Sequence, residues 1–93
     1  MRSEPQASEV SKTEIFLTSW CPYCRRAVEL LRAKGHEFEI IDLEREPDRR
    51  EEMNRRSGRT SVPQIFVGET HVGGYDDLAA LEAAGELDAL LEA

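Results

Sequence analysis

The sequence predicts a single α/β domain whose elements follow the order βαβαββα. The first observation is a short, apolar, β-prone segment at 14–18. The second is a helical spacing of apolar residues over 22–34, followed by another strand-like segment at 38–42. Two strands joined through a helix form a βαβ unit, in which the strands run parallel. The third observation is a pair of strand-like segments, 64–67 and 70–72, close enough in the chain to form an antiparallel hairpin.

The first predicted helix has a clear start and a clear end. Pro22 suits a first helical position, because it has no N–H to leave unpaired and its φ is already helical. The apolar residues that recur along this helix are Ala27, Val28, Leu30 and Leu31. Gly35 follows as a C-terminal cap, and the second strand then ends at Asp42.

The next predicted helix is short and charged. Pro47 precedes a run at 48–56 in which Met53 is the only sizeable apolar residue, so most of this helix should face solvent. Gly58 ends it. The hairpin comes next and is followed by two glycines that break its second strand.

The final predicted helix begins near two aspartates. Asp76 or Asp77 can cap its N-terminus, and Gly85 is expected to interrupt or bend it. The apolar residues of this segment are Leu78, Leu81, Leu87, Leu90 and Leu91.

Composition and charge exclude several classes of function. The chain has 93 residues, with 12 Lys and Arg against 19 Asp and Glu, and its formal charge is −7. Phosphates repel such a protein, so nucleic acid is not an expected partner. Apolar runs are far shorter than the roughly 20 residues of a membrane helix, and the start of the chain has no apolar signal segment. We therefore expect a cytoplasmic monomer with no membrane contact, a mobile tail at 1–12 and one domain at 13–93.

The two cysteines, Cys21 and Cys24, are the strongest chemical signal in the sequence. A disulfide between residues so close in the chain closes a very short loop and adds little stability. Zinc would need two more ligands, and His36 and His71 are not at ligand spacing, so no metal site is expected. A Cys-x-x-Cys pair at a strand-to-helix junction is the spacing of redox-active dithiols. An inert buried pair, or half of a metal site shared between subunits, remains the alternative.

The two sulfurs are expected to have different roles. Cys21 lies where the amides at the helix start are unpaired, which favours a thiolate, and Arg25 and Arg26 add positive charge one turn later. Cys24 lies inside the helix and should remain a protonated thiol. Cys21 is therefore the predicted nucleophile, and Cys24 is the predicted resolving thiol.

Three motifs stand out: Cys21–Cys24 (CPYC), Arg59–Phe66 (RTSVPQIF) and Gly73–Leu78 (GGYDDL). Together they resemble the motifs of the dithiol glutaredoxins of the thioredoxin superfamily, and the resemblance covers nearly all of residues 14–91. The resemblance implies a thioredoxin-like fold, with a four-stranded mixed sheet flanked by helices. It also implies a thiol-disulfide oxidoreductase that takes glutathione as co-substrate and has no tightly bound cofactor. Its expected partners are disulfide-bearing and glutathionylated proteins.

The resemblance also implies a glutathione site. Val62–Pro63 looks like the superfamily's cis-proline, which would turn the Val62 backbone outward so that glutathione's cysteine can pair with it. Asp76 and Asp77 begin a helix whose free amides suit one carboxylate, and Asp77 can receive the ligand's ammonium. Arg50 aligns with a position that contacts the other carboxylate. The full set of expected contacts is Tyr23, Arg50, Ser61, Val62, Pro63, Gly74, Asp76 and Asp77.

Two departures from the family pattern leave alternatives open. Many glutaredoxins have a Lys where this chain has Thr18, and the lead-in Thr18–Cys21 is similar to those of mycoredoxins and thioredoxin. The donor could therefore be another thiol, although the segment Gly73–Asp77, which mycoredoxins typically lack, favours glutathione. A carrier of a glutathione-ligated [2Fe–2S] cluster is a further alternative. Pro22 argues against it, because similar cluster-binding proteins tend to have Gly or Ser there.

Overall fold

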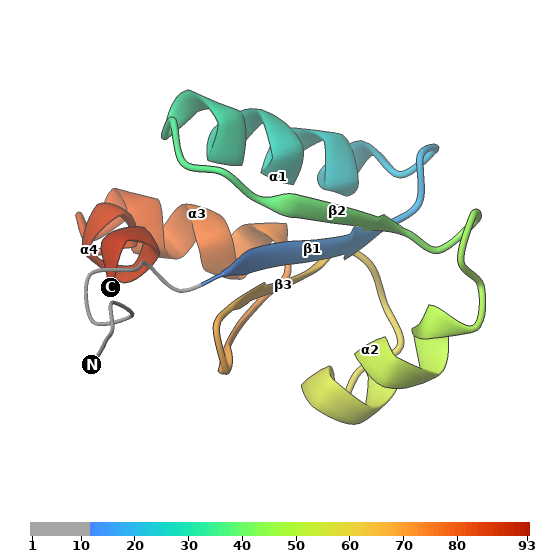
Figure 1. Cartoon of the computed structure of the whole chain (residues 1–93). Coiled ribbons are helices and arrows are strands. Elements are labelled where there is room, and N and C mark those ends of the chain that lie inside the picture. The colour runs from blue at the N-terminus through green and yellow to red at the C-terminus, as the bar shows by residue number, and fades with distance from the viewer. Residues whose placement is uncertain (1–11) are drawn as a thin grey trace, which may run out of the picture.

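Residues 12–93, which the structure describes, form a four-stranded sheet with helices on both faces (Figure 1). The structure is a computed structural model. The strands are β1 (Thr13–Leu17), β2 (Glu39–Asp42), β3 (Gln64–Val67) and β4 (Thr70–Gly73). The helices are α1 (Pro22–Ala33), α2 (Arg49–Ser57), α3 (Tyr75–Ala83) and α4 (Leu87–Glu92). Apart from Lys12, the predicted tail at 1–12 lies outside the described residues.

The sheet has the order β2-β1-β3-β4 and is mixed, as predicted. β1 pairs in parallel with β2, with Phe16 opposite Ile41, because α1 carries the chain back to the starting edge of the sheet. β1 pairs antiparallel with β3, with Ile15 opposite Ile65, and the hairpin adds β4 at the edge. β1 is therefore an interior strand, and the loop after its carboxyl end leads directly to Cys21.

Alternation along β1 creates two hydrophobic cores. Ile15 and Leu17 face α1, α3 and α4, whereas Phe16 faces α2 on the other side of the sheet. Figure 1 shows α1 and α3 on one face and α2 on the opposite face. Ile15 and Phe16 are fully buried, and each contributes about 1.5–3 kcal/mol by leaving water. The central strand is thus fixed from both sides.

α1 starts and ends where the sequence predicts. Its N-cap is Cys21, Pro22 is the first helical residue, and Gly35 follows the end with a φ of 78°. Ala27 and Leu31 are buried against the sheet. The helix has 12 residues, and within 12–93 no helix is long and apolar enough to cross a membrane.

α2 is charged and largely exposed, as predicted, but Met53 attaches it to the sheet. Met53 is fully buried in the same core as Phe16 and Phe66. Arg56 covers this core, with its guanidinium carbon 4.2 Å from the centre of the Phe66 ring, and it forms an ion pair with Glu14 at 2.8 Å. One methionine and one stacked arginine therefore hold a helix that has almost no apolar face.

The last predicted helix is interrupted at Gly85, as expected, so that α3 and α4 are separate helices. Gly85 has a φ of 75°, a left-handed conformation that suits glycine. The N-cap residue of α3 is Gly74 rather than Asp76 or Asp77, although Asp77 does take part in capping the helix start. Asp77 reaches back from the first turn, and its carboxylate accepts a hydrogen bond from the Gly74 amide at 2.9 Å.

Candidate active site

The nucleophile predicted from the sequence lies at the N-terminus of α1. Cys21 has an extended backbone, with φ −86° and ψ 119°, and its sulfur accepts a hydrogen bond from the Cys24 amide at 3.3 Å. Both cysteines are free thiols, with exposed fractions of 7% for Cys21 and 1% for Cys24. The Cys21 sulfur therefore lies at the positive end of the α1 dipole.

Cys24 is suited to a different role. The pKa of its thiol is raised to about 12, chiefly because the thiol is buried. The neighbouring Cys21 sulfur contributes to this rise, and the nearby Thr18 backbone opposes it. Cys24 is therefore a protonated thiol at neutral pH and needs help to lose its proton.

The Val62–Pro63 segment lies directly beside Cys21, the predicted nucleophile. The peptide bond between these residues is cis, and the Cys21 sulfur lies 3.9 Å from the Val62 carbonyl oxygen. The chain thus presents a backbone polar group of Val62 at the Cys21 sulfur, 41 residues away in sequence. This is the backbone placement that the sequence predicts.

A groove of about 210 Å³ begins next to this contact. Its lining residues are Tyr23, Arg59, Ser61, Val62, Pro63, Gln64, Gly74, Tyr75, Asp76 and Asp77. The structure therefore brings together every residue predicted to contact glutathione except Arg50. The Arg50 guanidinium instead donates a hydrogen bond to the Thr60 carbonyl at 3.0 Å, which ties α2 to the loop before Ser61.

Sequence reasoning missed three of the lining residues. Arg59 and Tyr75 lie within motifs that carry the family resemblance, which is the signal that could have identified them. Gln64 begins an apolar strand, and it is 1% exposed. Its amide nitrogen donates to the Ser61 carbonyl at 3.0 Å, and its amide oxygen lies 2.7 Å from His71 Nε2. A polar residue at the start of a buried strand indicates such a network.

Opposite charges meet in the groove. An Arg59 nitrogen lies 3.4 Å from an Asp77 carboxylate oxygen, and both side chains are about half exposed. The Gly74 amide, with a smaller effect from Arg59, lowers the pKa of Asp77, so the carboxylate is ionised. Tyr23 and Tyr75 form an aromatic wall, with ring centres 6.4 Å apart. The groove thus offers a cation, an anion and an apolar surface.

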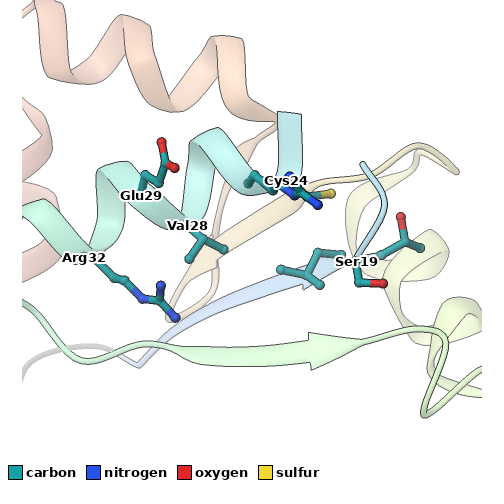
Figure 2. A pocket seen from close by; sticks show the side chains of 8 residues that line it. Ser19, Cys24, Val28, Glu29 and Arg32 are labelled. Carbon is teal, nitrogen blue, oxygen red and sulfur yellow. The ribbon is translucent and has the colours of Figure 1, made fainter. Parts of the chain in front are cut away.

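Thr18 does not lie in this groove. It is 3% exposed and lines a second cavity, of about 280 Å³, together with Cys24 (Figure 2). Of the two arginines expected to add charge near Cys21, Arg25 lines that second cavity and Arg26 stacks on Tyr23 at 5.4 Å. The position at which many similar proteins carry a Lys therefore turns its side chain into the interior.

Metal ligands do not converge in the part of the chain that the structure describes. Among residues 12–93, no group of three or more His, Cys, Asp or Glu side chains could hold a metal ion. His71 is engaged with Gln64, and His36 lies 3.8 Å from Glu92. The described site is therefore a dithiol beside a groove.

The glutaredoxin family model matches residues 13–72, which include both cysteines and the cis-proline. The chain belongs to the glutaredoxin family. Glutaredoxins are thiol-disulfide oxidoreductases, and this chain is therefore an enzyme of that class. The family and the fold predicted from the sequence are both confirmed.

Similar glutaredoxins agree with this assignment. A glutaredoxin of Pseudomonas aeruginosa is 58% identical over 79 residues, covering 85% of this chain and 94% of the relative. The solution structure of a glutaredoxin from Brucella melitensis has a TM-score of 0.77 and 52% identity, covering 89% of this chain and 90% of that one. The crystal structure of a buckwheat glutaredoxin–glutathione complex has a TM-score of 0.80 and 27% identity, covering 87% and 76%.

Proposed function

We propose that this glutaredoxin uses glutathione to reduce protein disulfides and protein–glutathione mixed disulfides through Cys21 and Cys24. The observation that supports this most strongly is the Val62 carbonyl beside the Cys21 sulfur, at the start of a groove with one cation and one anion. Glutathione is a tripeptide with a central cysteine, one ammonium and two carboxylates. Its cysteine can pair with the Val62 backbone while its sulfur meets Cys21.

The ends of glutathione then meet groups of matching charge. Its ammonium meets the Asp77 carboxylate, and the carboxylate next to it meets the amides at the start of α3. Arg59 lies 3.4 Å from Asp77 and supplies a cation within the same groove. For the second carboxylate we propose Arg50, whose guanidinium would exchange the Thr60 carbonyl for the ligand. The buckwheat relative, which was crystallised with glutathione, supports a glutathione groove in this fold.

The reaction proceeds by thiol–disulfide exchange. The Cys21 thiolate attacks a substrate disulfide, a Cys21–substrate disulfide forms, and the other substrate sulfur leaves as a thiolate that takes up a proton. Cys24 then attacks the Cys21 sulfur and releases the second substrate thiol, or glutathione clears the mixed disulfide. Two glutathione molecules restore the dithiol and leave as glutathione disulfide. Two electrons pass from the glutathiones to the substrate.

The absence of a Lys at Thr18 does not remove the glutathione site. An exposed ion pair contributes about 0–1 kcal/mol, whereas the Val62 pairing and the α3 amides supply several hydrogen bonds of roughly 0.5–1.5 kcal/mol each. The remaining contacts therefore outweigh the missing charge. Losing that charge should raise the apparent Michaelis constant for glutathione by no more than about fivefold, the factor that corresponds to 1 kcal/mol.

A coupled assay tests the donor. Turnover of a small glutathione mixed disulfide is followed with NADPH and glutathione reductase, beside assays linked to mycothiol and to thioredoxin reductase. Turnover with glutathione is expected, and turnover with only one of the other two donors would overturn the assignment. Cys24→Ser serves as the companion variant. It should retain deglutathionylation and lose most protein-disulfide reduction, because only the second reaction needs the resolving sulfur.

A further inference from the structure

A buried polar network connects β4, β3 and the loop before the cis-proline. Gln64 is the first residue of β3, and it is 1% exposed although the rest of the strand is apolar. Its amide nitrogen donates hydrogen bonds to the Ser61 carbonyl oxygen at 3.0 Å and to the Ser61 hydroxyl oxygen at 3.3 Å. Its amide oxygen lies 2.7 Å from His71 Nε2. The amide therefore has partners at both ends.

The Ser61 carbonyl fixes the direction of every hydrogen bond in this network. A carbonyl oxygen only accepts, so the amide nitrogen of Gln64 faces Ser61 and the amide oxygen faces His71. Burial and, to a smaller extent, Arg59 lower the pKa of His71 against the opposing effect of Asp77, so the ring is neutral at pH 7. Its single N–H is therefore on Nε2, where it donates to the Gln64 oxygen.

The histidine end of the network is held firmly. The His71 ring packs on the Phe66 ring, with ring centres 4.9 Å apart and an angle of 30° between their planes. Phe66 is 2% exposed and meets Phe16 edge to face at 5.7 Å, in the core on the α2 side of the sheet. Pairing of β3 with β4 also sets His71 opposite Phe66. His71 is therefore a fixed point from which the Gln64 amide is oriented.

The serine end of the network faces the groove proposed for glutathione. Ser61 lines this groove and is exposed, whereas Gln64 behind it is buried. A hydroxyl that accepts a hydrogen bond still has its own hydrogen to donate, so Gln64 leaves the Ser61 hydrogen available to an acceptor in the groove. Gln64 also holds the Ser61 carbonyl, one residue before the Val62 carbonyl that lies 3.9 Å from the Cys21 sulfur.

We propose that Gln64 and His71 are positioning residues for glutathione binding, which hold Ser61 and the adjoining Val62 backbone in the geometry that receives the ligand. This inference rests on the proposed function, because it concerns the same groove. Replacing a buried hydrogen-bonded pair by apolar groups of the same shape is nearly neutral for stability, so burial alone does not require a glutamine here. A fully satisfied polar network instead fixes one arrangement of the groups that it joins.

A disulfide-exchange equilibrium measures the groove directly. In the variant Cys24→Ser, the Cys21 sulfur forms a mixed disulfide with either glutathione or 2-mercaptoethanol, a thiol without charged or peptide groups. In the exchange, one disulfide bond at Cys21 breaks and another forms, and the incoming thiol gives up the proton that the departing thiol takes up. Intact-mass spectrometry gives the ratio of the two forms in a buffer that holds both thiols and their disulfides. Cys21 is common to both forms, so the preference for glutathione reports on the groove.

Two substitutions in this background break the network at different points. Gln64→Met keeps the length of the side chain and removes its hydrogen bonds to Ser61 and His71. It should lower the preference for glutathione about fivefold, the factor that corresponds to about 1 kcal/mol. His71→Phe keeps an aromatic ring on Phe66 and removes the N–H. Gln64 then keeps Ser61 but loses its fixed point, so the preference should fall about twofold.

The matched control is Thr13→Val. Thr13 is also a buried polar residue, 3% exposed, and it pairs with Val67 at the other end of β3. This substitution should leave the preference for glutathione unchanged. An unchanged preference in Gln64→Met or in His71→Phe, or an equal decrease in Thr13→Val, would overturn the proposal. If Gln64→Met does not fold, His71→Phe alone decides.

A double substitution tests whether Gln64 acts through Ser61. Ser61→Ala should lower the preference for glutathione, and Ser61→Ala combined with Gln64→Met should lower it by less than the product of the two separate factors. A full product would contradict action through Ser61. The starting variant separates this inference from the proposed function. No preference for glutathione in Cys24→Ser itself would contradict the glutathione groove, whereas a clear preference that survives Gln64→Met would contradict only the role of the network.

Discussion

The raised pKa of Cys24 leads to a prediction that can be measured directly. The variant Cys21→Ser leaves Cys24 as the sole thiol, so its alkylation by iodoacetamide reports on that sulfur alone. In this variant the contribution of the Cys21 sulfur to the pKa disappears, but burial, which is the largest cause, remains. We therefore expect the pKa of Cys24 to stay well above the ordinary value of about 8.5.

The magnitude follows from two opposing effects. For a pKa of about 12, roughly one Cys24 in 100,000 is ionised at pH 7, against about 3% of a free thiol. This alone slows alkylation about 3,000-fold. A more basic thiolate is also more nucleophilic, with a Brønsted coefficient of about 0.4–0.5. This greater nucleophilicity raises the alkylation rate by a factor of roughly 30 and so offsets part of the decrease. Ionisation dominates, so Cys24 should react at least about tenfold, and up to about 100-fold, more slowly than free glutathione.

The pH dependence separates this cause from simple shielding. Steric shielding of the sulfur from the reagent would slow alkylation by the same factor at every pH, whereas a raised pKa makes the rate rise about tenfold per pH unit from 7 to 10 without a plateau. Cys24→Ser, which leaves Cys21, should be alkylated faster at pH 7. A plateau for Cys24 below about pH 9, or a rate equal to that of glutathione, would refute the reasoning.

Three further predictions concern the supports of the site. Gly73→Ala should destabilise the fold by about 1–3 kcal/mol in urea unfolding, because Gly73 has a φ of 116° and an added Cβ would collide with the Asp77 carboxylate. Gly74→Ala, whose Cβ would lie 3.5 Å from the Pro63 carbonyl, should be nearly neutral for stability. Arg56→Ala should cost roughly 2 kcal/mol, between an exposed and a buried ion pair, whereas the exposed Arg55→Ala should cost under about 0.5. The pKa of Asp77 is lower folded than unfolded, so its stabilisation is full above about pH 4 and is lost as the pH falls through the folded value. Asp77→Asn should therefore lower the unfolding free energy at pH 7 and have little effect at strongly acid pH.

The sequence by itself determined the order of the elements and the position of Cys21 at the start of a helix. Pro22 and Gly35 mark the ends of α1 through local backbone preferences, and the same is true of Gly58 for α2. Cys21 lies at a helix start for the same local reason. Most residues that line the groove beside Cys21 were also predictable, because they belong to the two sequence motifs that contain Val62 and Gly74.

Only the tertiary structure decided what lies next to what. Arg59 lies in the groove and Arg50 does not, because the path of the loop before Val62 and the position of α2 determine where each guanidinium reaches. Cys24 and Thr18 line the same cavity because α1 packs over the end of β1. Burial and long-range neighbours set the pKa of a thiol and the partners of a hydroxyl, and both arise only when distant segments of the chain come together.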